Sequence, residues 1–146
     1  MFRGICYKAF STKKTFSDAA AACGEDGGTL AMPRNAETNA FLFSLYKSVS
    51  KRVNPWSVSF KRPCWIGLHD QREEGSFEWV DGSALGTYNS WGPGHPDSFY
   101  DSHDCVVHSA FWINMYKYKW ANYACDDKYF FICQAVPGTS HNRTVS

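Results

Sequence analysis

Six cysteines in a chain of 146 residues constrain the fold of this protein more than any other feature of its sequence. Such a density of cysteine in a short chain is typical of oxidising compartments, where disulfides support a small hydrophobic core. The six residues allow fifteen pairings, so sequence alone does not define the connectivity. The length suits one domain and is short for two. We therefore expect a single secreted domain that is held together by disulfides.

The charges and the apolar runs exclude two classes of partner. The chain has 15 Lys and Arg against 14 Asp and Glu, and the basic residues are scattered, which argues against a nucleic acid partner. The longest apolar runs, such as 19–23 and 130–133, are far shorter than the roughly 20 residues that cross a bilayer. Residues 1–7 lack the apolar block of a signal peptide. We therefore expect a mature or excised form of a secreted protein, with no membrane insertion.

Two segments near the amino end have the spacing of amphipathic helices. Thr15 and Ser17 precede an alanine-rich segment in which apolar residues recur at intervals of four and three, and two glycines follow it. A second helix is predicted after Pro33, with Asn35 as its cap. The apolar stripe expected on this second helix consists of Ala40, Phe41, Leu45 and Val49.

The remainder of the chain has the pattern of short strands separated by loops. Runs rich in aromatic and β-branched residues predict strands at 64–68, 77–80, 105–108 and 130–134. The segment 81–104 is dense in Gly, Ser, Pro and Asp and is long for a connection, which indicates a functional loop. The tail 137–146 has no periodicity, so we expect a domain at 1–136 followed by a disordered tail.

The order of the motifs resembles that of a C-type lectin-like domain. The similarity covers roughly residues 5–135 and implies an α+β fold, with two helices and small antiparallel sheets that carry a long loop region. The motifs, in order, are Cys23 on the first helix, Trp65-Ile66-Gly67-Leu68, Phe77-Glu78-Trp79, Trp91-Gly92-Pro93-Gly94-His95-Pro96-Asp97, Asp104-Cys105-Val106, Trp120-Ala121-Asn122 and Phe131-Ile132-Cys133.

The resemblance implies two of the disulfides. It pairs Cys23 with Cys133 and Cys105 with Cys125. Two alternatives remain for Cys6 and Cys64: they form a third disulfide, or Cys64 is a buried free thiol and the partner of Cys6 lies upstream of Met1.

Sugar-binding members of this family hold a calcium ion in the long loop, and the resemblance places five positions of this chain at that site. Ca²⁺ takes six to eight oxygen ligands. Here two positions carry His95 and His103, a third carries Ala121, and only Asp97 and Asn122 offer side-chain oxygen. Asp97 matches a position that marks galactose selectivity, but His95 replaces the glutamine that accompanies it. The calcium site is therefore degenerate, and a galactose preference does not follow.

The two histidines suggest a different ion. Imidazole nitrogen suits zinc better than calcium, and His95, Asp97 and His103 form a ligand set that zinc accepts. The alternative is that both histidines are ordinary solvated loop residues. Candidates for a further ligand to this zinc ion are Asn122, Asp101 and Asp104.

A second group of acidic residues resembles part of the family's auxiliary calcium site. It consists of Asp70, Glu74 and Asp104. Acidic side chains on a surface are more often solvated or paired with a cation such as Arg72, and the sequence favours that interpretation. Calcium at this group is the second metal prediction.

The segment 111–119 is crowded with aromatic residues that could contact a ligand. Trp112, Tyr116 and Tyr118 are candidates for stacking on a sugar or anchoring a protein interface. The alternative is that Phe111, Trp112 and Ile113 cover the underside of the loop.

No catalytic motif accompanies these features. Neither Gly-x-Ser-x-Gly, a phosphate loop nor His-Glu-x-x-His occurs, and a disulfide-bonded Cys105 cannot act as a nucleophile. We therefore expect a secreted, non-catalytic innate immune lectin that binds glycans on microbial surfaces. The alternative is a metal-independent, protein-binding domain of the same fold that uses the aromatic segment 111–119.

Overall fold

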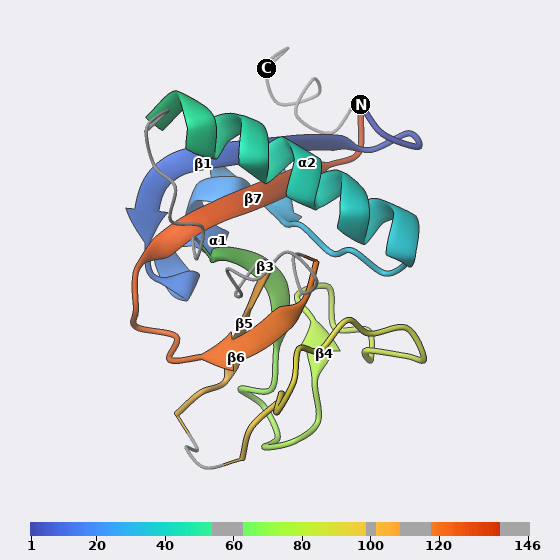
Figure 1. Cartoon of the computed structure of the whole chain (residues 1–146), viewed down its shortest axis with the longest axis vertical. Coiled ribbons are helices and arrows are strands. Elements are labelled where there is room, and N and C mark those ends of the chain that lie inside the picture. Colours follow the sequence, from blue (N-terminus) through green and yellow to red (C-terminus); the bar gives the residue numbers. More distant parts are fainter. Residues whose placement is uncertain (54–62, 99–101, 109–117, 138–146) are drawn as a thin grey trace.

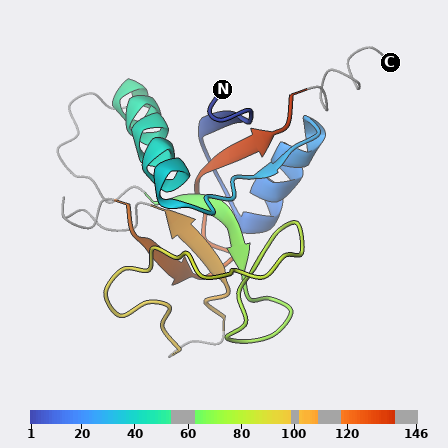
Figure 2. The same ribbon diagram turned by 90° about the vertical axis from the view of Figure 1, so that its right-hand side faces the viewer.

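The computed structural model describes residues 1–53, 63–98, 102–108 and 118–137. Figure 1 shows two helices packed beside a twisted sheet, with the loops that follow β3 and β4 gathered at the opposite end from the helices. Figure 2, turned by 90°, shows the same separation of helices and loops. The elements in chain order are β1 (Cys6–Lys14), α1 (Phe16–Glu25), β2 (Thr29–Leu30), α2 (Ala36–Val53), β3 (Cys64–His69), β4 (Glu78–Trp79), β5 (Cys105–His108), β6 (Trp120–Tyr123) and β7 (Tyr129–Ala135).

The described strands form a mixed sheet in the order β1-β7-β3-β5-β6, with β2 paired to β7 and β4 paired to β3. Strand β3 runs parallel to β7, and the other pairs are antiparallel. The first and last strands therefore lie side by side, and the pair β5–β6 forms the end of the sheet that faces the long loop. This architecture confirms the predicted α+β fold with two helices.

Helix α1 begins where the sequence predicts it. The hydroxyl Oγ1 of Thr15 accepts a hydrogen bond of 3.2 Å from the main-chain N–H of Asp18, which satisfies one of the N–H groups left unpaired at a helix start. The helix buries Phe16, Ala19 and Cys23. The disulfide between Cys23 and Cys133 then joins α1 to β7.

Helix α2 also begins as expected, but its most buried face differs from the predicted stripe. Asn35 Oδ1 accepts a hydrogen bond of 2.9 Å from Thr38 N, as a cap does. Phe41 and Leu45 of the expected stripe are only partly buried, as is Ala40. The difference arises because the polar residue Asn39 is buried and hydrogen-bonded in the interior. A search for a repeat of apolar residues does not detect such a position. The buried residues of the described part of this helix are Thr38, Asn39, Leu42 and Tyr46.

The core is built from the predicted strands together with three described strands that periodicity did not reveal, β1, β2 and β6. Trp65, Trp79 and Trp120 are fully buried, and the rings of Trp79 and Trp120 meet edge to face at 5.9 Å. Strand β1 was not predicted, since its exposed lysines and small residues resemble a loop. Strand β6 was recognised as a motif without being assigned as a strand, because its four residues are too few to show a period of two.

The structure contains both disulfides that the resemblance implies, Cys23–Cys133 and Cys105–Cys125. The alternative in which Cys6 pairs with Cys64 is wrong, because both are free cysteines, the first exposed and the second buried. Strand β7 lies between them, with Cys6 opposite Ala135 and Cys64 opposite Phe130. Five residues of strand separate these points, about 16 Å, which no disulfide spans.

Candidate functional site

The long loop between β4 and β5 is anchored to strand β6. The main-chain N–H of Gly92 donates to Trp120 O at 2.9 Å, and Trp120 N donates to Ser90 O at 2.8 Å. Below the loop, the ring of Trp91 meets the ring of Trp120 edge to face at 5.6 Å. Aromatic packing and main-chain hydrogen bonds therefore fix the loop just before His95.

Asn122 of β6 holds the next part of this loop. Its Oδ1 atom accepts hydrogen bonds from Asp97 N at 2.9 Å and from His95 Nδ1 at 3.0 Å. Its Nδ2 group donates to the main-chain oxygens of Asp97 at 2.9 Å and of His103 at 3.0 Å. The side chain is 2% exposed. Asn122 therefore connects three loop residues to the edge of the sheet.

The structure brings the predicted zinc ligands together through Asp97. Its Oδ2 atom lies 3.8 Å from His95 Nδ1, and its Oδ1 atom lies 3.8 Å from His103 Nδ1. The side chains of His95 and Asp97 are each 18% exposed, and that of His103 is 27% exposed. Asp97 Oδ1 is itself buried and accepts no hydrogen bond from any described residue. The three side chains thus form a partly open acid and imidazole surface.

The hydrogen bond to Asn122 determines the tautomer of neutral His95. A side-chain amide oxygen can only accept, so the proton of the neutral imidazole is on Nδ1 and the lone pair is on Nε2. Any metal bound by His95 in this arrangement would therefore bind Nε2, with Asn122 orienting the ring from the other side.

This loop does not fit a calcium ion. Ala121 has no ligand atom, and His95 and His103 offer nitrogen where Ca²⁺ requires oxygen. The lone pairs of Asn122 Oδ1 are already directed at two donors, so this oxygen is not available either. At the positions where the family holds calcium, this chain instead has hydrogen bonds between Asn122 and the loop residues His95, Asp97 and His103.

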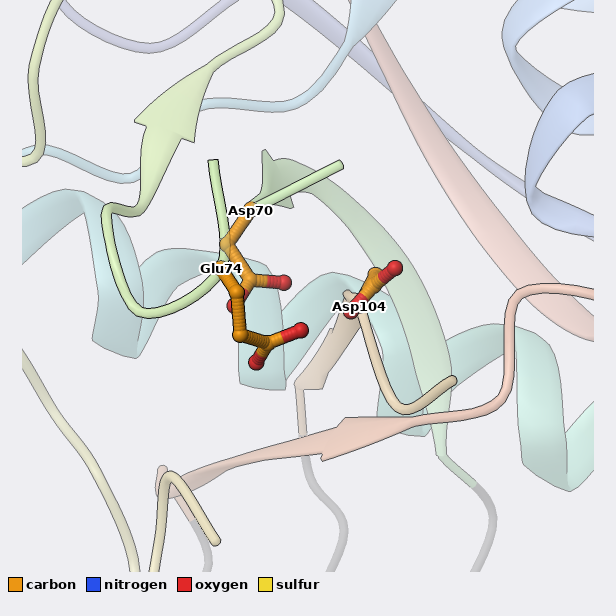
Figure 3. Close-up of side chains that lie close together, drawn as sticks. All are labelled: Asp70, Glu74 and Asp104. Carbon is orange, nitrogen blue, oxygen red and sulfur yellow. The ribbon is translucent and has the colours of Figure 1, made fainter. Parts of the chain in front are cut away.

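The acidic group that includes Asp104, the residue before β5, does converge. In the described part of the chain, Asp70, Glu74 and Asp104 are the group whose ligand atoms all lie within 4.8 Å of one another. Figure 3 shows the three carboxylates turned toward one another, from the end of β3, the following loop and the residue before β5. The histidine pair with Asp97 does not converge in this way among the described residues.

Asp70 is the buried member of this group. It is 2% exposed, and its Oδ2 atom accepts a hydrogen bond of 2.8 Å from Gly75 N. Its Oδ1 atom is buried and accepts no hydrogen bond from the described residues. The nearby Arg72 pairs with Glu78 at 3.3 Å. The group therefore presents a buried carboxylate oxygen to a shared point, as a hard cation requires.

The aromatic candidates are described only in part. Trp112 and Tyr116 lie outside the described residues, as does Asp101. Tyr118 is 36% exposed, and its ring meets that of Phe43 edge to face at 5.3 Å. Tyr118 is thus presented at the surface beside α2.

A buried hydrogen-bond network that the sequence patterns do not reveal lies behind the site. Asn39 of α2 accepts a hydrogen bond from the indole of Trp120 at 2.8 Å and donates one to Tyr118 O at 2.8 Å. His108 Nε2 lies 3.0 Å from Asn39 O, and Ser90 Oγ donates to Tyr118 O at 3.0 Å. The network links α2 to the base of the long loop. The sequence does contain one signal for this network. Asn39 and His108 are polar residues at positions where the helix and strand patterns require burial.

Comparison with known proteins identifies relatives over most of the chain. The family model for the lectin C-type domain matches residues 12–135. The chain is 34% identical to the alpha-N-acetylgalactosamine-specific lectin of Patiria pectinifera over 137 residues, 91% of this chain and 75% of that protein. It is 31% identical to collectin-11 of Bos taurus over 129 residues, 88% of this chain but only 42% of that protein. Human lithostathine shares the fold with a TM-score of 0.76 at 30% identity, covering 92% of this chain and 93% of that one.

Among the described residues, no helix is both long and apolar enough to cross a membrane.

Proposed function

Because the chain belongs to the C-type lectin domain family, whose lectins are non-catalytic carbohydrate-binding proteins, we propose that it binds glycans through the surface formed by His95, Asp97 and His103. The proposal rests on one observation. Asn122, on the edge strand β6, makes hydrogen bonds with His95, Asp97 and His103. Relatives that include an N-acetylgalactosamine-specific lectin and a collectin support a sugar as the ligand.

The chemistry of this surface suits sugar hydroxyls. A hydroxyl both donates and accepts, and the partly exposed carboxylate of Asp97, with a side chain that is 18% exposed, can accept from it. Hydrogen bonds to a charged acceptor are about twice as strong as neutral ones. Asp97 is thus the expected main acceptor. The neighbouring imidazoles of His95 and His103 can each donate or accept a hydrogen bond.

We place these glycans on microbial surfaces and the domain outside the cell. Two disulfides in a chain of this size suit an oxidising compartment. Binding to whole bacteria tests the microbial source directly, and free oligosaccharides test sugar recognition by itself.

The decisive experiment measures binding to a glycan panel and to whole bacteria, in EDTA and after addition of Ca²⁺ or Zn²⁺. Asp97→Asn should weaken glycan binding at least about tenfold, because an ionised acceptor becomes a neutral amide. Glu25→Gln, at the exposed end of α1, is the matched control and should bind like the wild type. Unchanged affinity of Asp97→Asn for every bound glycan would exclude this surface. If no glycan or bacterium binds in any arm, the glycan proposal is wrong, and the protein-binding alternative is the one to test next.

Calcium is proposed at the acidic group of Asp70, Glu74 and Asp104. One ligand atom from each of the three side chains converges, against the six to eight oxygens that Ca²⁺ takes, so the affinity should be weak, with a Kd of about 10⁻⁴ to 10⁻³ M. Calorimetry should show this binding lost in Asp70→Asn and retained in Asp97→Asn. Micromolar calcium binding that disappears in Asp97→Asn would place calcium in the long loop and contradict the assignment.

Zinc is proposed at His95 Nε2, Asp97 and His103, after a side-chain adjustment that brings the three ligands to one point. Zinc accepts imidazole and carboxylate ligands at about 2.0 to 2.2 Å. His95→Ala and His103→Ala should each abolish zinc binding in calorimetry, while His141→Ala should not. Full zinc affinity in both loop variants would show that these histidines do not bind the metal.

A further inference from the structure

We infer that Asn122, rather than a bound divalent cation, organises the loop that carries His95, Asp97 and His103. The inference depends on the proposed function only in taking this loop as the ligand-binding surface. It starts from a disagreement between the family and the chain: the family implies calcium in this loop, and the residues present do not fit calcium.

The first step is the complete use of the Asn122 amide. An asparagine side chain has two acceptor lone pairs and two N–H donors. Its oxygen receives Asp97 N–H and His95 Nδ1–H, and its nitrogen donates to two main-chain carbonyls. A main-chain N–H can only donate and a carbonyl can only accept, so these partners also define which end of the amide is oxygen. A buried amide satisfied in this way has one orientation.

The second step is the range of chain that the side chain joins. Asn122 is 25 residues from Asp97 and 19 from His103, and it contacts the main chain of both. Asn122 of β6 is therefore hydrogen-bonded to the loop on both sides of residues 99–101. The positions of Asp97 and His103 then follow from β6, which is itself paired with β5 through Val106 opposite Asn122.

The Asn122 amide group interacts with the loop carbonyls in the way that a cation would. A cation in a loop attracts main-chain and side-chain oxygens to one point, and an N–H group satisfies a carbonyl oxygen in the same electrostatic sense. Asn122 Nδ2 does this for Asp97 O and His103 O at 2.9 and 3.0 Å. An aspartate at this position would bring a negative charge to the same two carbonyls. On this inference the hydrogen bonds of Asn122 shape the loop, and any cation adds to a shape that these bonds already hold.

Asn122 is also a positioning residue for His95. The bond from His95 Nδ1 to the amide oxygen keeps the proton on Nδ1 and directs the Nε2 lone pair away from the sheet residue. Loss of Asn122 should therefore change the tautomer of His95, which a purely structural role elsewhere would leave unaltered.

The test uses the Asp97 amide proton as a reporter, because it donates directly to Asn122. Its hydrogen exchange is measured by NMR in the wild-type protein with EDTA, then with Ca²⁺ and with Zn²⁺. We expect the wild-type rate to change less than about twofold between these conditions. An exchange rate about tenfold faster in EDTA, restored by either metal, would overturn the inference and assign the loop to a cation.

Two variants sharpen the test. Asn122→Ala removes every contact, and Asn122→Asp keeps the acceptor but loses both donors, so in EDTA each should exchange the Asp97 amide at least about tenfold faster. The ¹⁵N shifts of His95 should show loss of the Nδ1–H tautomer in Asn122→Ala. Asn89→Asp, an exposed change in the same loop, is the matched control. Wild-type exchange in both Asn122 variants would overturn the inference, and the EDTA comparison stands even if a variant fails to fold.

The outcome is separable from that of the proposed function. A loop that remains protected in EDTA without binding any glycan supports the inference and contradicts the function. Glycan binding with a loop that opens in EDTA supports the function and contradicts the inference.

Discussion

His108 is a histidine in the interior of the sheet, and its surroundings leave it neutral. It is fully buried on β5, between Cys64 of β3 and Trp120 of β6, and its Nε2 atom donates to Asn39 O of α2. Burial lowers the pKa of His108 to about 4, and the hydrogen bond to Asn39 opposes this only in part. Asn39 and Trp120 carry no ionisable group, and burial raises the pKa of the Cys64 thiol, so these neighbours bring no charge to the imidazole.

Acid should therefore destabilise the protein through His108. The unfolded chain takes up this proton near pH 6.5 and the folded chain only near pH 4. The stability is thus complete above pH 6.5, and about 3 kcal/mol of the free energy of unfolding is lost as the pH falls to 4. Urea titrations over this range measure the loss. His108→Leu, which cannot take up a proton, should show a correspondingly smaller slope, and an equal slope in the two proteins would contradict the assignment.

The pair β5–β6 carries the candidate site, and a disulfide closes the segment that contains this pair. Cys105 begins β5 and Cys125 follows β6, with a sequence separation of 20 between them. Cys105 also lies opposite Tyr123 in the antiparallel register, so the bridge continues the pairing of the two strands. The disulfide thus maintains the base from which Asn122 reaches the loop.

Removal of this disulfide should weaken the domain while leaving the other bridge intact. In the loop-entropy model, the double variant Cys105→Ala with Cys125→Ala loses about 3 kcal/mol of the free energy of unfolding. The corresponding change at Cys23 and Cys133, with a separation of 110, should cost about 5 kcal/mol. Denaturation under non-reducing conditions tests both values. A larger loss for the shorter loop would mean that native-state packing, rather than the unfolded chain, controls the effect.

The arrangement of the whole sheet explains why two cysteines remain free. Cys6 lies at the exposed start of the edge strand β1, whereas Cys64 is 1% exposed at the centre, where β3 pairs with both β5 and β7. Burial also raises the pKa of the Cys64 thiol, which lowers the fraction of reactive thiolate. Access to Cys64 therefore requires the sheet to open.

The folded protein should accordingly react with alkylating agents at one thiol and the unfolded protein at two. Iodoacetamide followed by peptide mass mapping under non-reducing conditions should label Cys6 in native buffer and both Cys6 and Cys64 in urea. The Cys6→Ser variant should show no labelling in native buffer. Rapid labelling of Cys64 in the folded protein would contradict its placement in the core.

The resemblance in motif order implied the family fold, and periodicity predicted both helix starts and four strands. These features depend on local physics: caps at Thr15 and Asn35, and apolar residues repeated at helical or strand spacing. The motifs also placed His95, Asp97, His103 and the acidic group at candidate sites. Strand β1 escaped prediction because its pairing with β7 at the far end of the chain, rather than its composition, makes it a strand.

Only the tertiary structure decided which groups the candidate residues contact. Asn122 resembles a metal ligand in sequence, but its four hydrogen-bonding positions are taken by residues 19 to 27 positions away, which meet only in the folded chain. Asp70, Glu74 and Asp104 converge because the end of β3 lies beside the start of β5. Motifs determine which side chains are available, and long-range pairing determines their partners, since hydrogen bonds and ion binding depend on distances of a few ångströms that sequence spacing does not specify.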